Sequence, residues 1–177
     1  MDTYISRSFY MWLYAVVLVI FLVFDIYRLK NASFKQKCWN RFSHFFKEKE
    51  ENSLVSSTWA PIDMLIVIPL CSRPTIIAAL MAGYNDPIAA IFGMRFGGKK
   101  NRTGRTWAGT IAHMVSTVVL ASVALWIIGF YFPLYFLIPI AIIGAMIERY
   151  FPYPDDNIIV PLCFSFMFEM VVRFVLG

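Results

Sequence analysis

The sequence predicts an all-α protein, a polytopic bundle of about six transmembrane helices with an additional amphipathic helix at the cytoplasmic surface of the membrane. Of its 177 residues, 59% are hydrophobic and only 15% are charged, which leaves too little polar surface to coat a soluble domain of this size. Long apolar runs recur along the chain, and most Lys and Arg residues lie between them. We therefore expect one membrane domain covering residues 1–177.

The net charge of +5 would suggest a nucleic-acid partner in a soluble protein. Here membrane orientation and anionic lipid headgroups account for the cations, so we expect no nucleic acid. The three cysteines have no metal-ligand spacing, and we expect free thiols at Cys38, Cys71 and Cys163.

The first half of the chain contains the first apolar run, residues 9–24, which is followed by cations that favour an outside N-terminus. Residues 34–51 place aromatic side chains at helical spacing and cations on the other faces, typical of an interfacial helix on the inner leaflet. A helix that packs on the protein itself is an equally open alternative.

The second and third spans are expected at residues 59–71 and 75–92. The former is short for a crossing, and the latter is interrupted by Asn-Asp-Pro at residues 85–87. Interrupted helices at membrane depth are tolerated where they line a polar cavity. Asp63 is expected either to face that cavity or to cap a helix start.

Three further spans are expected at residues 107–130, 133–147 and 158–176. With six spans, thirteen Lys and Arg residues fall on one side of the membrane and three on the other, which places both termini outside. In the last span, Glu169 and Arg173 are four residues apart, and we expect them to form an ion pair.

The chemistry is expected in residues 83–110, where an acid in an apolar span precedes a glycine-rich basic loop. An ionisable residue at membrane depth, here Asp86, indicates function by default. The loop combines cations with flexible backbone, which suits polyanions: Arg95, Lys99, Lys100, Arg102 and Arg105 lie among Gly93, Gly97, Gly98, Gly104 and Gly109. The alternatives are that Gly93 and Gly97 only pack helices and that the cations only set topology.

A second acidic element, Asp155-Asp156-Asn157, precedes the last span on the same predicted face. These residues are expected to bind a metal ion or accept a proton, although they could serve only as a helix cap. His44 and His113 are assigned no role, since a lone His in such a place is more often a packing residue. The order of residues 98–104 does not match a phosphate loop, which excludes nucleotide-hydrolysing motor domains.

Residues 86–97, the basic segment after them and residues 104–110 resemble the membrane CTP-dependent lipid kinases: dolichol kinase, phytol kinase and the CTP-using diacylglycerol kinases. In that family an Asp, a spaced Ala, two glycines and a Lys-Ser/Thr-x-x-Gly element recur in this order. Residues 155–161 resemble the family's acidic-Asn segment before a proline-containing span. Arg105 stands where Lys is usual and can hold phosphate equally well, and Ala108 stands where many members have Glu.

The resemblance implies an enzyme that transfers the terminal phosphate of CTP to the hydroxyl of a membrane lipid alcohol, with Mg²⁺ as cofactor. The implied catalytic residues are Asp86, Asp155, Asp156 and Asn157, of which Asp86 and Asp156 would hold the metal. The implied nucleotide-binding residues are Gly93, Gly97, Gly98, Lys99, Lys100, Arg102, Arg105 and Thr106. Diacylglycerol, polyprenol, dolichol and phytol remain open as acceptors.

Two other functions stay open: a cytidylyltransferase that makes a CDP-lipid, and a lipid or ion transporter that uses Asp86 and Asp63 as an intramembrane relay. The expected partners are CTP, a membrane lipid alcohol and the bilayer, and a homo-oligomer is left open. The active site is expected in the cytoplasm. Because the chain is shorter than the eukaryotic dolichol kinases, a bacterial or archaeal cell membrane is favoured over the endoplasmic reticulum.

Overall fold

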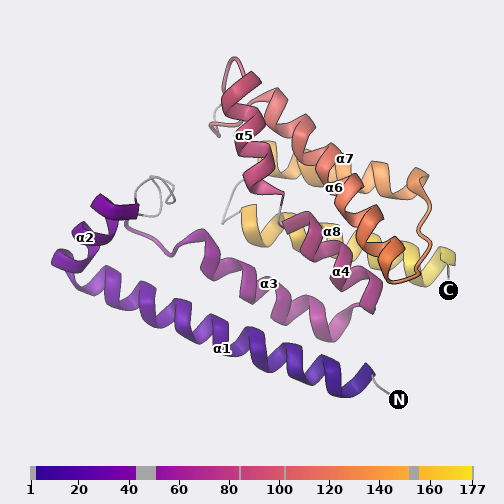
Figure 1. Ribbon diagram of the computed structural model, residues 1–177, viewed down its shortest axis with the longest axis horizontal. Coiled ribbons are helices and arrows are strands. Elements are labelled where there is room, and N and C mark those ends of the chain that lie inside the picture. The colour runs from indigo at the N-terminus through magenta and orange to yellow at the C-terminus, as the bar shows by residue number, and fades with distance from the viewer. Residues whose placement is uncertain (1–2, 43–50, 84, 102, 152–155, 177) are drawn as a thin grey trace. The chain divides into compact units, whose positions relative to one another are not determined.

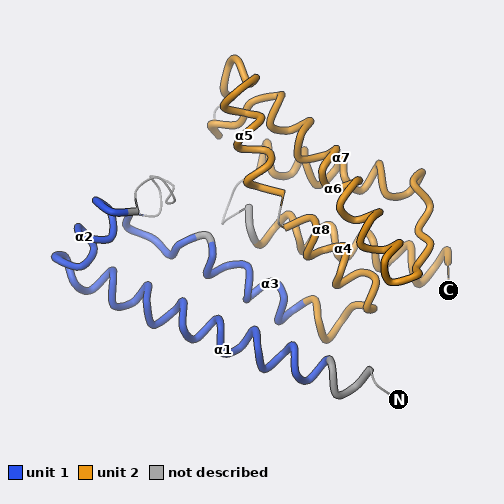
Figure 2. Tube along the Cα trace, viewed as in Figure 1, with its two compact units in different colours: residues 1–66 blue, residues 67–177 orange. Residues whose placement is uncertain are grey.

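A computed structural model describes residues 3–42, 51–83, 85–101, 103–151 and 156–176. Over these residues the protein is helical and contains no strand, so the predicted all-α fold class is confirmed (Figure 1). The helices form two compact units, residues 1–66 and residues 67–177 (Figure 2). The boundary between the units lies inside α3 (Ser56–Leu70).

The N-terminal unit contains α1 (Thr3–Lys30), α2 (Ala32–Phe42) and the first part of α3. α1 has 28 residues, and only 6% of its most apolar window is buried inside the protein. Trp12 is 74% exposed, as expected of a helix surrounded by lipid. The helix predicted over residues 34–51 corresponds to α2, which begins at Ala32. Residues 43–50 lie outside the described part of the chain.

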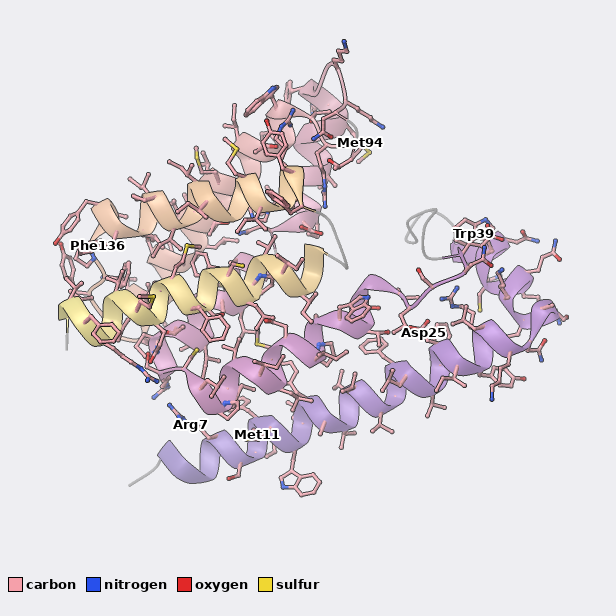
Figure 3. The ribbon with its side chains drawn as sticks, turned by 180° about the vertical axis from the view of Figure 1, so that it is seen from behind. Arg7, Met11, Asp25, Trp39, Met94 and Phe136 are labelled. Atoms are coloured by element: carbon pink, nitrogen blue, oxygen red, sulfur yellow. The ribbon has the colours of Figure 1, made fainter. Side chains whose placement is uncertain are left out.

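A buried ion pair joins α1 to the segment that leads into α3. Asp25, which is labelled in Figure 3, is fully buried, and its Oδ1 accepts a hydrogen bond of 3.1 Å from Arg28. Its Oδ2 accepts from the backbone N–H of Val55 at 2.9 Å and from the hydroxyl of Thr58 at 2.6 Å. Arg28 also donates to the backbone carbonyls of Glu51 and Ser53. Both charges are therefore compensated, which a buried pair requires.

Among the described residues, the C-terminal unit consists of the end of α3, five further α-helices and one short π-helix. α6 (Trp107–Ile127) contacts three of its neighbours, namely α4 (Arg73–Gly83), α5 (Asp86–Phe96) and α7 (Leu134–Tyr150) (Figure 1). α8 (Asp156–Val171) packs on α4 and α7 and continues as a short π-helix, η2 (Val172–Leu176). α6 is thus the helix from which most of the unit's packing is organised.

The predicted interruption of the third apolar segment is confirmed. α4 ends at Gly83 and α5 begins at Asp86, with Pro87 in its first turn, where the missing N–H of proline is tolerated. Asn85 is fully buried between the two helices, and its Nδ2 donates a 2.6 Å hydrogen bond to Thr117 of α6. The interruption therefore brings polar residues against α6 within an apolar unit.

Within the described residues, four segments are long and apolar enough to cross a membrane: Arg7–Lys30, Arg73–Phe96, Trp107–Ile127 and Ile158–Leu176. α3 and α7 have 15 and 17 residues, fewer than the roughly 20 of a typical crossing. The four apolar segments are compatible with an integral membrane protein. The predicted number of six spans is not confirmed.

Glycines bring α5 and α6 into close contact. A Cβ added to Gly93 would lie 3.0 Å from Thr106 Oγ1, and one added to Gly109 would lie 3.0 Å from the carbonyl oxygen of Ala89. A Cβ on Gly97 would collide with the carbonyl oxygen of Gly93 and would lie 2.7 Å from Thr106 Cγ2. Ordinary van der Waals contact of a Cβ with a neighbouring atom lies at 3.4–4 Å, so each of these Cβ atoms would crowd its neighbour. Gly93 and Gly97 thus have a packing role, and their expected role in phosphate binding remains a prediction.

Replacing Gly109 by Ala should destabilise the protein by about 1–3 kcal/mol, because the added methyl group meets a backbone oxygen. Helix propensity alone favours Ala over Gly by roughly 1 kcal/mol, so it cannot produce the loss. Gly144→Ala in α7 is the matched control, since its Cβ would meet Val160 Cγ1 at an ordinary 3.9 Å. Thermal unfolding in detergent compares the two, and an unchanged midpoint for Gly109→Ala would contradict the close contact.

The predicted pairing of Glu169 with Arg173 is confirmed, with Arg173 Nε 2.6 Å from Glu169 Oε1. Glu169 Oε2 accepts from the backbone N–H and the hydroxyl of Ser72 and from the hydroxyl of Thr75, at 2.8, 2.7 and 2.5 Å. Arg173 also donates to the carbonyl of Leu70. This cluster holds the turn between α3 and α4 against α8, and its groups have partners that give it a structural role.

The structure also tests the expectations for Asp63 and for the three cysteines. Asp63 lies in the middle of α3, which begins at Ser56, so the expectation that it caps a helix start is wrong. It is 1% exposed, and its carboxylate oxygens have no hydrogen-bond partner among the described residues. The three cysteines, all of them within the described residues, form no disulfide, as predicted.

Candidate functional site

The loop between α5 and α6 has a defined turn structure. Gly98 and Gly104 have φ angles of 59° and 79°, a conformation that other residues rarely adopt. Between them, Asn101 Oδ1 accepts from the N–H and the hydroxyl of Thr103, at 3.1 and 2.7 Å, and from the N–H of Arg105 at 2.8 Å. The side chain of Asn101 therefore shapes the backbone that carries the predicted cations.

The same loop is attached to the C-terminal end of α7. Asn101 Nδ2 and the hydroxyl of Thr103 both donate to the carbonyl of Arg149, at 2.9 and 2.8 Å. The Arg149 side chain returns to α6, where Nη1 donates to Thr110 Oγ1 at 3.2 Å and the guanidinium lies 4.0 Å from the ring centre of Trp107. The loop, the start of α6 and the end of α7 are thus joined by hydrogen bonds.

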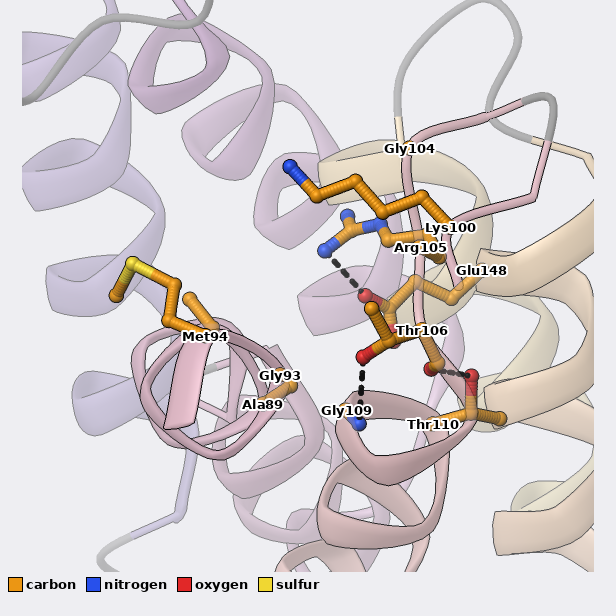
Figure 4. Close-up of a pocket in the computed structure, with 11 residues that line it drawn as sticks. Ala89, Gly93, Met94, Lys100, Gly104, Arg105, Thr106, Gly109, Thr110 and Glu148 are labelled. Atoms are coloured by element: carbon orange, nitrogen blue, oxygen red, sulfur yellow. Dashed lines mark hydrogen bonds and ion pairs between the residues drawn. The ribbon is translucent and has the colours of Figure 1, made fainter. Parts of the chain in front are cut away.

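A pocket of about 190 Å³ lies between α5 and these three segments (Figure 4). Thr106 Oγ1 accepts from the N–H of Gly109 at 3.2 Å and so caps α6, whose first turn favours an anion. Lys100 and Arg105 extend over the pocket from the loop, opposite α5 (Figure 4). The lining residues are Ala89, Ala90, Gly93, Met94, Lys100, Gly104, Arg105, Thr106, Gly109, Thr110 and Glu148.

The volume and the charges indicate what the pocket can hold. Sites for drug-sized ligands enclose roughly 300–1,000 Å³, so this pocket has room for phosphate groups and not for a whole nucleotide. Two cations and a helix N-terminus are the usual protein ligands of phosphate. The pocket is therefore suited to the phosphate part of a larger molecule.

A buried carboxylate, Glu148 of α7, closes one side of the pocket. Its side chain is 4% exposed and lies between two groups from other segments. Oε1 is 2.8 Å from Nη1 of Arg105, and Oε2 is 2.6 Å from Nδ1 of His113. Arg105 thus contributes both to the pocket and to a salt bridge beneath it.

Asp86 joins this carboxylate and His113. One potential ligand atom from each of Asp86, His113 and Glu148 lies within 4.8 Å of the others, and the three residues come from α5, α6 and α7. His113 and Glu148 are buried, and Asp86 is half-buried. Carboxylate oxygens and imidazole nitrogens are common metal ligands and proton acceptors, so this group can serve either chemistry.

A polar stripe on α6 connects the pocket to this group and continues past it. Thr106, Thr110, His113 and Thr117 recur at helical spacing on the buried side of α6. At the far end, Thr117 accepts from Asn85, whose own Oδ1 has no partner among the described residues. The stripe places hydrogen-bonding groups along a helix that is otherwise suited to lipid.

The structure brings together only part of the predicted site. Gly93, Lys100, Arg105 and Thr106 line the pocket, and Asp86 lies close to its carboxylate. The described lining does not include Gly97, Gly98 or Lys99. Arg102 and Asp155 lie outside the described residues; Asp156 and Asn157 begin α8, but the positions of their side chains are not described.

The site also contains residues to which the sequence assigned no role. They are Glu148, His113, Asn101 and Arg149. His113 was interpreted as a packing residue, and the structure instead places its Nδ1 beside a carboxylate. Two signals in the sequence could have indicated these residues. One is the regular spacing of polar residues in α6, and the other is the pair of consecutive charged residues, Glu148 and Arg149, at the end of an apolar run.

Comparisons with family models, with curated proteins and with solved structures found no match for this chain. Over its described residues the protein is all-helical, and Asp86, His113 and Glu148 lie next to a pocket that Lys100 and Arg105 line.

Proposed function

We propose that the protein is a CTP-dependent kinase that phosphorylates the hydroxyl of a membrane lipid alcohol. The observation that carries the proposal is the pocket at the start of α6, which Lys100 and Arg105 line together with the buried Glu148, and the carboxylate of Glu148 in turn lies close to Asp86. Cations and carboxylates side by side are what phosphoryl transfer from a nucleotide requires. The motif resemblance to the CTP-dependent lipid kinases supports the choice of CTP.

The basic part of the pocket would bind the phosphates. The transferred phosphoryl group carries its charge on peripheral oxygens, and donors already held in place stabilise that charge without reorganisation. Arg105 is held by Glu148, and the first turn of α6 is held by the Thr106 cap. Both therefore meet the incoming phosphates in a fixed position.

The acidic part would serve the acceptor and the metal ion. The acceptor oxygen forms a bond to the terminal phosphorus of CTP, the bond from that phosphorus to the bridging oxygen breaks, and CDP leaves. The hydroxyl proton passes to a carboxylate, for which Glu148, Asp155 and Asp156 are the candidates. Asp86 and Asp156 are the expected holders of Mg²⁺, which neutralises phosphate charge when bound.

The membrane arrangement expected from the sequence completes the proposal. It comprises six spans with both termini outside and the pocket at the cytoplasmic face of a bacterial or archaeal cell membrane. The acceptor is a lipid whose hydroxyl reaches the site from the bilayer, such as diacylglycerol or a polyprenol, dolichol or phytol.

Incubation of the purified protein with a lipid extract and labelled CTP should yield a phosphorylated lipid and CDP, and Asp86→Asn should lower the rate by roughly a hundredfold. Release of pyrophosphate would indicate the cytidylyltransferase, and preference for ATP would contradict the family assignment. Asp63→Asn should retain the activity, whereas a transporter that relays protons through Asp86 and Asp63 would lose its function in both variants. Full activity in Asp86→Asn would remove Asp86 from the mechanism.

A further inference from the structure

The polar atoms of Asp86, His113 and Glu148 lie close together although the three residues come from three different helices. Asp86 is the first residue of α5, His113 lies in α6 and Glu148 lies near the end of α7. Their potential ligand atoms lie within 4.8 Å of one another. Ligands at about 2.0–2.2 Å from one cation are at most about 4.4 Å apart, so a shift of a few tenths of an ångström completes the geometry.

The contact between His113 and Glu148 is the second observation. Nδ1 and Oε2 are 2.6 Å apart, yet their geometry is not that of a hydrogen bond, and Nδ1 has no hydrogen-bond partner among the described residues. His113 is 2% exposed, so water does not solvate this nitrogen. Two atoms that both carry lone pairs repel each other at this distance unless a cation or a proton lies between them. A metal ion bound by both atoms would hold them about 3 Å apart, the spacing of two ligands at about 2.1 Å from one ion, so the pair would open by a few tenths of an ångström on binding.

The salt bridge of Glu148 leaves one carboxylate oxygen for the metal. Arg105 contacts Oε1, and Oε2 faces His113. A charged partner on the other oxygen orients a ligating carboxylate, and such supporting contacts strengthen metal binding. Arg105 also belongs to the pocket, so it connects the cluster to the place where an anion would bind.

The donor set indicates the class of cation. One imidazole and two carboxylates form a mixed nitrogen and oxygen site, whereas Mg²⁺ and Ca²⁺ prefer oxygen ligands alone. Imidazole suits the divalent first-row transition ions, and carboxylates make Mn²⁺ an acceptable member of that class.

We propose that Asp86, His113 and Glu148 form a binding site for a divalent transition-metal ion of the Mn²⁺ type, which the protein holds in the absence of nucleotide. This site differs from the Mg²⁺ site expected from the sequence in two of its ligands and in the cation it selects. It needs neither CTP nor a lipid, so it stands independently of the proposed function.

Titration of the metal-free, detergent-purified protein with MnCl₂, followed by the electron paramagnetic resonance signal of free Mn²⁺, tests the site directly. We expect one Mn²⁺ per chain and a rise in the thermal midpoint on binding. His113→Gln and Glu148→Gln should each weaken binding by at least about tenfold. A tenfold excess of Mg²⁺ over Mn²⁺ should displace little of the bound ion.

Two variants control for the general loss of a ligand-type side chain. His44→Gln removes the other histidine of the chain, and Glu51→Gln removes an exposed glutamate whose Oε1 is 3.6 Å from Lys35 Nζ. Both should bind Mn²⁺ like the wild type. Absence of stoichiometric binding by the folded wild type would overturn the proposal, as would wild-type affinity in His113→Gln. Mn²⁺ binding without lipid phosphorylation would contradict the kinase alone, and phosphorylation without Mn²⁺ binding would contradict the metal site alone.

Discussion

Replacing Glu148 by Gln is expected to lower kcat for lipid phosphorylation by about a hundredfold or more, the range seen when an acid-base or metal-ligating group is removed. The amide has nearly the same volume, but it cannot balance the charge of Arg105 or share a cation with His113. Steady-state kinetics with CTP and the acceptor lipid would measure the change. KM for CTP should rise as well, because Arg105 loses the partner that positions it.

Glu169→Gln is the matched control for this prediction. Glu169 is also a buried glutamate in a salt bridge with an Arg, but it lies in the cluster that holds the turn between α3 and α4. Its replacement should lower the thermal midpoint and leave kcat of the folded protein unchanged. An equal loss of kcat in both variants would show that the effect of Glu148→Gln comes from stability and not from the site.

Replacing Arg28 by Ala is expected to lower the free energy of unfolding by about 3–5 kcal/mol, because Asp25 is then left as a buried charge without its partner. Arg28 is 1% exposed and also holds the backbone carbonyls of Glu51 and Ser53, so water cannot readily take its place. Denaturant unfolding in detergent micelles would measure the loss.

The partly exposed pair between Lys35 and Glu51 provides the comparison. Its atoms are 3.6 Å apart and its side chains are 24% and 47% exposed, so Lys35→Ala should cost at most about 1 kcal/mol. Adding Asp25→Asn to Arg28→Ala should recover part of the loss, since it removes the uncompensated charge. Equal losses for Arg28→Ala and Lys35→Ala would contradict the role assigned to the buried pair.

Much of the helical framework could be predicted because its causes are local. The apolar runs predicted helices, Asn85 and Pro87 predicted the interruption before α5, and the spacing of Glu169 and Arg173 predicted their pair. The number of membrane spans was harder to predict from the sequence, because it depends on the length of each helix as well as on its apolarity. α3 and α7 are apolar but short.

The site was only half predictable for a different reason. Its cations follow one another in a single loop, where composition alone indicates an anion. Glu148 and His113 come from separate helices, and only tertiary packing brings their side chains to 2.6 Å. Asn101 was equally inaccessible, since its partner is a backbone carbonyl at the end of α7.

The glycines of α5 show how one pattern can satisfy two interpretations. Gly93 and Gly97 were interpreted as phosphate-binding residues because cations follow them, and a helix-packing role was the alternative. The close approach to Thr106 shows the packing role, while Gly93 also lines the pocket. Sequence spacing cannot separate these roles, because both require a residue without a side chain at the same helix face.

The polar stripe of α6 also determines how far the carboxylates lie from the pocket along the helix axis. From Thr106 at the pocket to His113 at the carboxylates, the helix advances by about 10 Å at 1.5 Å per residue. In a kinase of this form, the phosphates of CTP would bind at the level of the first turn of α6. The acceptor oxygen would approach from further inside the bilayer. The depth of the lipid hydroxyl in the bilayer would then determine which lipids are phosphorylated. A hydroxyl on an uncharged, slender lipid can lie at the level of His113, whereas a hydroxyl attached to a charged headgroup stays in the water.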